Sequence, residues 1–399
     1  MNTWSSPRSK GLVLQWRGRR FYLDTILLLA TLSLLLFGFV MVASASLHLG
    51  DRMGNDSFYY PRHQLIHIAT GIMVGIFVAS VRLDRLRTKS MTLYFLGLLL
   101  LVMVLIPGVG KVVNGSARWI NLFVVRIQVS EVFKLIAVIY VASFIDRHIH
   151  VVRTSVQGML RPFMLLSVGA LLMLMEPDFG ATVVIISTAM GMLFLAGASI
   201  WQFVALISIV VSAGVLLIVA APYRLRRVLS FVNPWDDPLN SDFQLSQALI
   251  AFGRGEWSGV GLGSSIQKMF YLPEAHTDFL FSVIGEELGL AGTITVIALF
   301  MVIVWRAFVI GQMAALHGTR FSAFLAYGIG IWFGLQSFIN MGVNMGMLPT
   351  KGLTLPLMSY GGGSMMVMCA ALAVLFRVKS EAIEAVSAKP RVRASWSSA

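Results

Sequence analysis

The chain has 399 residues, of which 57% are apolar and only 12% are charged. About a quarter of the residues in a soluble globular protein are charged, so this composition excludes an ordinary soluble domain. The formal net charge is +13, but the basic residues lie between apolar runs, which favours a membrane surface over nucleic acid as the partner.

Ten apolar segments predict transmembrane helices, since a bilayer core of about 30 Å takes roughly 20 helical residues to cross. The charge-free stretch 179–223 is too long for one span and fits two, with a turn at 197–199. The predicted fold class is an all-α polytopic membrane protein with ten transmembrane helices and a large outer loop, 222–277, between helices 7 and 8. The ten segments are 25–45, 64–81, 90–107, 130–145, 162–176, 179–197, 200–221, 278–304, 321–345 and 353–376.

The first apolar segment imitates a cleavable signal peptide, because it follows Arg17-Gly18-Arg19-Arg20 and ends near Ala43-Ser44-Ala45. Its apolar stretch exceeds the roughly 7–15 residues of a signal peptide, which favours a retained helix. With the N-terminus inside, 19 of the 31 lysines and arginines fall in cytoplasmic segments and 11 in outer ones. This bias places both termini in the cytoplasm.

The chain divides into a cytoplasmic N-terminal tail, 1–22, one membrane domain, 23–377, and a cytoplasmic C-terminal tail, 378–399. The C-terminal tail has no apolar stripe, so we expect it to be disordered or to lie on the anionic inner leaflet. The segments 107–129, 222–277 and 344–356 then face outward.

Ionisable groups in or beside membrane spans are costly and are therefore candidate functional residues. Glu131 and Lys134 are three residues apart on one helical face, so they could simply neutralise each other inside the membrane. Arg118 and Arg126 have no nearby sequence partner. They could clamp an anionic headgroup, or they could reach to lipid phosphates as ordinary interfacial arginines do.

The long outer segment contains dense turn signals at 233–238, followed by Leu245, Leu249 and Phe252 with the spacing of a short interfacial helix. A run of glycines follows at 253–263. No strand precedes it and no acidic ribose partner follows, so it is not a dinucleotide fingerprint. Its backbone amides could cradle a pyrophosphate, or the run could be a flexible loop.

The segment 271–279 opens the eighth span and contains Asp278. Thr277 could cap that helix, with Asp278 in its first turn as a favourable charge at the helix dipole. A face of small residues on the same side as Asp278 would admit a close helix or a polyprenyl chain. At least one of Glu286 and Glu287 is expected to pair with a buried cation. The small residues are Ser282, Gly285, Gly289 and Gly292.

Glycine and proline interrupt the helical pattern again at 348–363, which is tolerated at membrane depth where the backbone lines a cavity, so Lys351 could face a site. The pair His63 and His67 lacks an HExxH pattern, which disfavours a metal site there. Cys369 is the one cysteine, so there is no cysteine zinc site. No motif for a serine or cysteine nucleophile is present.

At these residues the chain resembles the SEDS family of shape, elongation, division and sporulation proteins, from about Asp24 to Arg377. The matching segments follow the family's order and spacing, and details near 264–274 and 349–352 resemble its division members more than its elongation members. Val129, Glu176 and Ser241-Asp242-Phe243 depart from the usual family pattern. The matching segments are 116–120, 177–180, 233–238, 271–279 and 348–363.

The resemblance implies a peptidoglycan glycosyltransferase that polymerises lipid II at the outer face of the bacterial inner membrane, at the division septum. Expulsion of a pyrophosphate needs charge stabilisation rather than a protonating acid, so one carboxylate is sufficient, and Asp278 is the predicted base. Arg118, Arg126 and Lys351 are the predicted pyrophosphate ligands. Glu131, Lys134, Glu286 and Ser359 are grouped with the substrate-binding residues.

The same resemblance implies lipid II and the nascent glycan strand as substrates, and a class B penicillin-binding transpeptidase of the divisome with its activators as partners. Membrane lipids are a further partner, and no nucleic acid is expected. No cofactor is assigned with certainty, although a divalent cation, Mg²⁺ or Mn²⁺, could stabilise the leaving group. A lipid II flippase and a noncatalytic division scaffold remain as alternatives.

Overall fold

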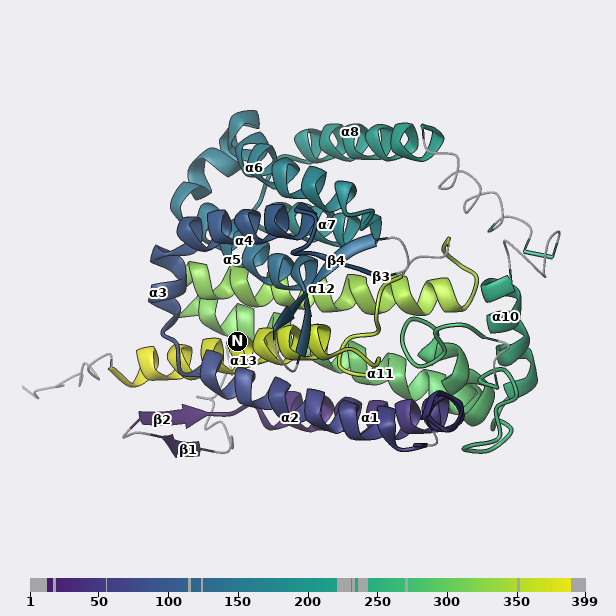
Figure 1. Cartoon of the computed structure of the whole chain (residues 1–399). Helices are drawn as coiled ribbons and strands as arrows, with labels where there is room; N and C mark the ends of the chain where they lie inside the picture. Colours follow the sequence, from purple (N-terminus) through teal and green to yellow (C-terminus); the bar gives the residue numbers. More distant parts are fainter. Residues whose placement is uncertain are drawn as a thin grey trace, which may run out of the picture.

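The computed structural model describes residues 13–16, 19–54, 56–113, 116–122, 125–220, 231, 234–235, 243–269, 272–349 and 352–388. The described chain is mostly helical, and each of the ten predicted segments coincides with a helix (Figure 1). These helices are α1 (Thr25–Gly54), α2 (Tyr59–Ala79), α4 (Ser90–Leu105), α5 (Val129–Thr154), α6 (Val156–Met175), α7 (Phe179–Leu195), α8 (Ile200–Val219), α11 (Leu280–Leu316), α12 (Arg320–Asn344) and α13 (Gly362–Ala388).

Length and apolar composition allow five of these helices, α1, α2, α6, α11 and α12, to cross a membrane, and α4, α7 and α8 contain shorter apolar stretches. Two further helices are α3 (Leu83–Thr88) and α10 (Phe243–Gly255). Helix α10 confirms that a short helix forms around the predicted Leu245, Leu249 and Phe252, and Leu245 on its apolar side is buried.

Helix α12 lies between two groups of helices, with α4 to α7 on one side and α1, α2, α11 and α13 on the other (Figure 1). Small residues allow this central position because they let helix backbones approach closely. A Cβ atom at Gly328 would lie 2.7 Å from Val138 of α5, and one at Gly330 would lie 2.9 Å from Ala307 of α11. Helix α8 lies at the edge of the bundle.

Two small antiparallel sheets correct the all-α prediction. Strands β1 (Val13–Trp16) and β2 (Arg19–Tyr22) form a hairpin within the segment predicted as an N-terminal tail. The Tyr22 amide donates a hydrogen bond to Ser380 of α13 at 3.5 Å. Strands β3 (Lys111–Val113), β4 (Ser116–Leu122) and β5 (Val125–Gln128) form the second sheet between α4 and α5. Backbone groups in this short connection thus pair with one another.

The last helix differs from its prediction at both ends. Residues 353–361, predicted as the start of the tenth span, form extended and turn structure, and α13 begins at Gly362. The interruption by glycine and proline predicted at 348–363 therefore takes up the first part of the predicted tenth span. At the other end, α13 continues to Ala388, so residues 378–388 of the predicted tail are helical.

Candidate active site at the start of helix α11

The carboxylate of Asp278 lies in the turn that leads into α11. Two amides of α12 hold this turn, since Asn340 and Asn344 donate hydrogen bonds to the Asp278 carbonyl at 2.9 and 3.0 Å. The Asn344 side-chain oxygen also accepts hydrogen bonds from the backbone and the hydroxyl of Ser282. Both asparagines are buried. The position of Asp278 is thus fixed through its backbone while its side chain is left half-buried.

The structure does not support the reading of this segment as a helix cap. The cap position of α11 is Phe279, and it forms no side-chain cap hydrogen bond. The Thr277 hydroxyl donates backward to the carbonyl and the carboxylate of Glu274, at 3.2 and 2.7 Å. Within the described part of the chain, the Asp278 carboxylate accepts no hydrogen bond. Its side chain therefore has no assigned role in starting the helix.

The electrostatic surroundings of Asp278 disfavour its charged form. Burial, and next the nearby carboxylate of Glu274, raise the pKa of Asp278 from 3.8 to about 7. Arg118 opposes this shift, whereas Asp178 adds to it. A carboxyl group that titrates near neutrality can take up a proton during a reaction, which is what a general base requires.

Arg118 on β4 connects the second sheet to the turn between α6 and α7. Its guanidinium donates to the carbonyls of Glu176 and Pro177 at 3.0 and 2.5 Å. The Asp178 side chain caps α7 by accepting from the Ala181 amide at 3.2 Å. These bonds place Arg118 and Asp178 beside the turn that carries Asp278, where both act on its charge.

The segment 352–361 lies against the same turn. A Cβ atom at Gly352 would lie 3.0 Å from the Asp278 carboxylate, so the backbone passes directly beside that group. The buried Ser359 hydroxyl donates to the Thr277 carbonyl at 2.6 Å and accepts from the Leu355 amide at 2.8 Å. Lys351, predicted to face the site, lies outside the described residues, although its neighbour Gly352 lies at the site.

Arg126 lies on β5 and is exposed. The sheet that carries it packs tightly on the start of α13, because a Cβ atom at Gly363 would lie 2.8 Å from the Arg126 carbonyl oxygen. Arg126 also acts electrostatically on Tyr360, which lies in the turn before α13. The two arginines of the predicted clamp therefore lie on adjacent strands at the same end of the molecule as Asp278.

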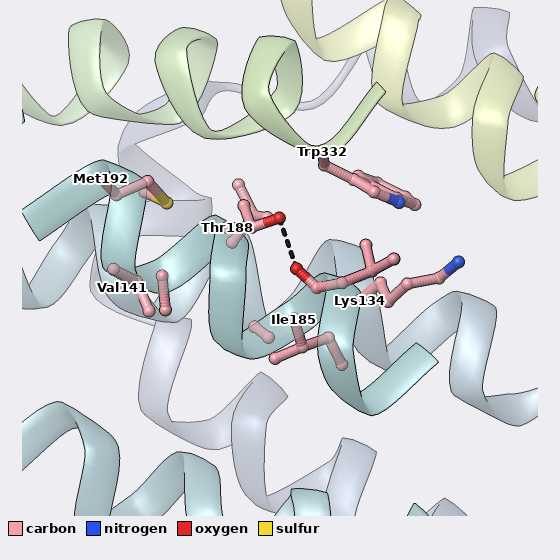
Figure 2. A pocket seen from close by; sticks show the side chains of 10 residues that line it. Lys134, Val141, Ile185, Thr188, Met192 and Trp332 are labelled. Atoms are coloured by element: carbon pink, nitrogen blue, oxygen red, sulfur yellow. Dashed lines mark hydrogen bonds between the residues drawn. The ribbon is translucent and has the colours of Figure 1, made fainter. Parts of the chain in front are cut away.

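Glu131 and Lys134 form the internal pair that their spacing predicted. The Lys134 ammonium lies 2.6 Å from Glu131 and 2.6 Å from the Gln336 side-chain oxygen, and it stands over the Trp332 ring. The adjoining cavity (Figure 2) is lined largely by apolar residues and has room for about one water molecule. The pair joins α5 to α12, and the cavity beside it is too small for a substrate.

The predicted pairing with a buried cation is confirmed for Glu287, whereas Glu286 pairs with an exposed cation. Glu286 accepts from Arg254 at 2.9 Å, from the Ser265 hydroxyl and from the backbone amides of residues 266 and 267. Glu287 pairs with Lys268 at 2.6 Å, and both side chains are almost fully buried. Ser44 of α1 donates to Glu287 at 2.8 Å. These carboxylates attach the end of α10 and the segment that follows it to α11.

Two glycines of the run 253–263, Gly255 and Gly259, pack against α11. A Cβ atom at Gly259 would lie 2.1 Å from the Glu287 carbonyl oxygen. Gly289 interrupts α11 with φ 63° and ψ −157°, and the Leu290 amide donates to the Glu256 carbonyl. The predicted small-residue face therefore admits protein, since a Cβ atom at Gly285 would lie 2.4 Å from the Phe252 ring.

In the described part of the chain, no three His, Cys, Asp or Glu side chains gather in a way that could hold a metal ion. Sequence reasoning did not single out Asn340 and Asn344, although they position Asp278, because neutral amides in a helix carry no motif. It noted Glu176 only as a departure from the family pattern. Both Glu176 oxygens are buried without a described hydrogen-bond partner, and burial raises its pKa to about 8.

Comparison with known proteins gives consistent matches over nearly the whole chain. Residues 25–384 match the model of the FtsW/RodA/SpoVE family, described as "Cell cycle protein". A protein of Methylococcus capsulatus named "Probable peptidoglycan glycosyltransferase FtsW" is 68% identical over 383 residues, which cover 96% of each chain. A protein of Methylomonas methanica with the same name is 58% identical, over 92% of this chain and 94% of that protein.

Two solved structures have the same fold. One is described as "Structural coordination of polymerization and crosslinking by a peptidoglycan synthase complex"; it aligns with a TM-score of 0.72 and 24% identity over 92% of this chain and 99% of that one. The other is the rod shape determining protein RodA of Thermus thermophilus, with a TM-score of 0.64 and 24% identity over 90% and 96% of the two chains. From the matched family and these relatives, the chain belongs to the SEDS family of cell cycle proteins.

Proposed function

We propose that this protein is a peptidoglycan glycosyltransferase that polymerises lipid II into glycan strands at the division septum. Its curated relatives carry the name of such an enzyme of the division type. The single observation that carries the chemistry is Asp278, a half-buried carboxylate that caps no helix and whose pKa burial raises to about 7.

In this proposal Asp278 is the general base. It takes the proton from the 4-hydroxyl of the acceptor N-acetylglucosamine, whose oxygen attacks the anomeric carbon of the lipid-linked N-acetylmuramic acid from the side opposite the pyrophosphate. The bond from that carbon to the phosphate oxygen breaks, and its electron pair leaves with undecaprenyl pyrophosphate. The transfer inverts the configuration, and no second carboxylate is needed to protonate the leaving group.

The leaving group gains negative charge as the bond breaks, so cations near Asp278 would stabilise the transition state. Arg118 is held beside the site by two backbone carbonyls, and other N–H groups of its guanidinium could contact a pyrophosphate. Arg126 and Lys351 complete the proposed set. A divalent cation would in this scheme arrive with the pyrophosphate and share one or two protein carboxylates.

The proposed topology has ten spans, both termini in the cytoplasm and the segment 222–277 in the periplasm. It places the Asp278 site at the outer face, where the lipid-linked donor carries its own activation and no nucleotide sugar is needed. A transpeptidase partner is consistent with the peptidoglycan synthase complex, one chain of which has the same fold as this protein. In that pairing the strand made at Asp278 would be crosslinked by the partner.

The experiment that tests this function gives purified full-length protein labelled lipid II in detergent and separates the products by size. We expect polymeric glycan from the protein alone or from its complex with a division transpeptidase whose own transfer activity is blocked. Transport of lipid II across vesicles without any polymer would instead favour the flippase. If a correctly inserted protein gives no polymer and no transport, the result would favour the scaffold.

A further inference from the structure

A second cavity lies at the opposite end of helices α4, α5 and α6 from Asp278. Helix α4 begins at the cavity with Ser90 and ends before the sheet that carries Arg118, about 20 Å farther along its axis. The cavity has a volume of about 510 Å³ and is partly open to the surroundings. Its lining residues are Ser90, Met91, Tyr140, Phe144, Arg147, His148, Arg161, Met164 and Leu165.

Two arginines at this cavity lack a carboxylate partner among the described residues. Arg147 donates only to neutral oxygens, including the hydroxyls of Ser90 and Ser143 at 2.7 and 2.6 Å. The neighbouring carboxylate of Asp146 is already paired with Arg87 at 2.7 Å. Arg161 is exposed at the first turns of α6 and forms no ion pair with a described residue. The cavity mouth therefore carries uncompensated positive charge.

The remaining wall is apolar and partly uncovered. Met91 and Met164 are 40% and 70% exposed, and the ring of Phe144 also borders the cavity. Along α5, Phe144 and Tyr140 lie one and two turns deeper into the predicted span than Arg147 and His148. Along α6, Met164 and Leu165 are likewise deeper than Arg161. The cations thus lie at the level of the lipid headgroups, with apolar surface below them.

We propose that this cavity binds an anionic phospholipid, with its phosphate at Arg147 and Arg161 and an acyl chain along the apolar wall. A soluble anion would use the arginines but not the exposed methionines. A zwitterionic lipid would fit the apolar wall, but its ammonium group would offset the attraction of the arginines. Basic pockets between transmembrane helices suit anionic headgroups for these reasons.

The test measures lipid retention rather than catalysis. Full-length protein is purified in detergent, mixed with equal amounts of phosphatidylglycerol and phosphatidylcholine, and examined by native mass spectrometry. We expect preferential retention of phosphatidylglycerol, reduced about fivefold in Arg161→Gln, the loss expected for one cation at a lipid surface. Met164→Trp should also reduce retention by filling the cavity. Arg320→Gln, at an exposed arginine that begins α12 away from the cavity, should retain lipid as the wild type does.

Three results would overturn the proposal. Equal retention of the two lipids would show that the arginines do not select an anionic headgroup. Wild-type retention by both Arg161→Gln and Met164→Trp would place the lipid elsewhere. Displacement of the lipid by millimolar inorganic phosphate, or preference for a polyprenyl pyrophosphate over phosphatidylglycerol, would assign the cavity to a different ligand.

Discussion

The charged residues of this protein form two groups with opposite arrangements. Inside the bundle, Glu131 with Lys134 and Glu287 with Lys268 are buried pairs at 2.6 Å, each with further hydrogen bonds. At the start of α11 and the end of α6, Asp278 and Glu176 have no described side-chain hydrogen bond, and burial raises the pKa of both carboxyls. A paired charge is compensated and joins helices, whereas an uncompensated carboxyl can exchange a proton. The difference indicates a structural role for the first group and leaves Asp278 of the second group free for a chemical one.

The largest expected effect separates these two roles at Asp278. Asn has nearly the size of Asp but cannot accept a proton near neutral pH, so Asp278→Asn should insert normally and lose about 10²–10⁴-fold in polymerisation rate. The measurement is polymer yield from labelled lipid II at equal protein level. Activity within a few-fold of wild type would move the base to Glu274, Glu286 or Asp178.

The paired group should respond in stability rather than in chemistry. Glu287→Gln leaves the Lys268 ammonium buried without its counter-charge, which should cost about 3–5 kcal/mol. We expect a clear fall in the thermal unfolding temperature in detergent. Asp56→Asn is the control, because its partner Arg62 is 64% exposed and such surface pairs contribute only about 0–1 kcal/mol. Equal effects of the two changes would remove the distinction between the groups.

Arg118 has features of both groups, because it donates to the turn at Glu176 and Pro177 and also acts electrostatically on Asp278. Lys keeps the charge but cannot reproduce the planar fork of a guanidinium, so Arg118→Lys should weaken lipid II use while the protein still inserts. A matched Arg126→Lys variant tests the second strand. Polymerisation kinetics over a range of lipid II concentrations provide the measurement. Wild-type behaviour of both variants would return these arginines to ordinary contacts with lipid phosphates.

The pH dependence of polymerisation sharpens the assignment of Asp278. A general base works only when ionised, and a carboxyl with a pKa of about 7 is roughly one-tenth ionised at pH 6. The rate should therefore rise about tenfold from pH 6 to pH 8 and then level off. A rate that is flat over this interval, measured with stable protein, would mean that the proton is taken by a group of much lower pKa.

The sequence predicted the helices well because each long apolar run leaves its backbone few alternatives to a helix in lipid. It also identified the acidic turn at Asp278 and the pairs at Glu131 and Glu287, whose partners are close in sequence or few in number. It could not predict that the glycines near Gly259 pack on α11, since close approach between distant segments has no local pattern. Asn340 and Asn344 were missed for the same reason. The short strands around Arg118 escaped notice because each has few residues, and the alternating pattern of β5 covers only four.

The smallest expected effect on polymerisation concerns Glu176, which belongs to the uncompensated group without a proposed part in the reaction. A glutamate carboxyl ordinarily has a pKa of 4.5, and burial followed by the charge of Asp178 raises the folded-state pKa of Glu176 to about 8, with Arg118 opposing. The folded protein therefore binds more protons than the unfolded chain between these values, so stability falls as pH rises through this window.

Glu176→Gln removes that titration while keeping the side-chain shape. The variant should match wild-type stability near pH 5 and exceed it increasingly up to pH 9, with polymerisation preserved within a few-fold. Thermal unfolding of the two proteins across this range gives the comparison. Parallel curves would mean that Glu176 titrates normally, and loss of polymerisation in the variant would add Glu176 to the reacting groups beside Asp278.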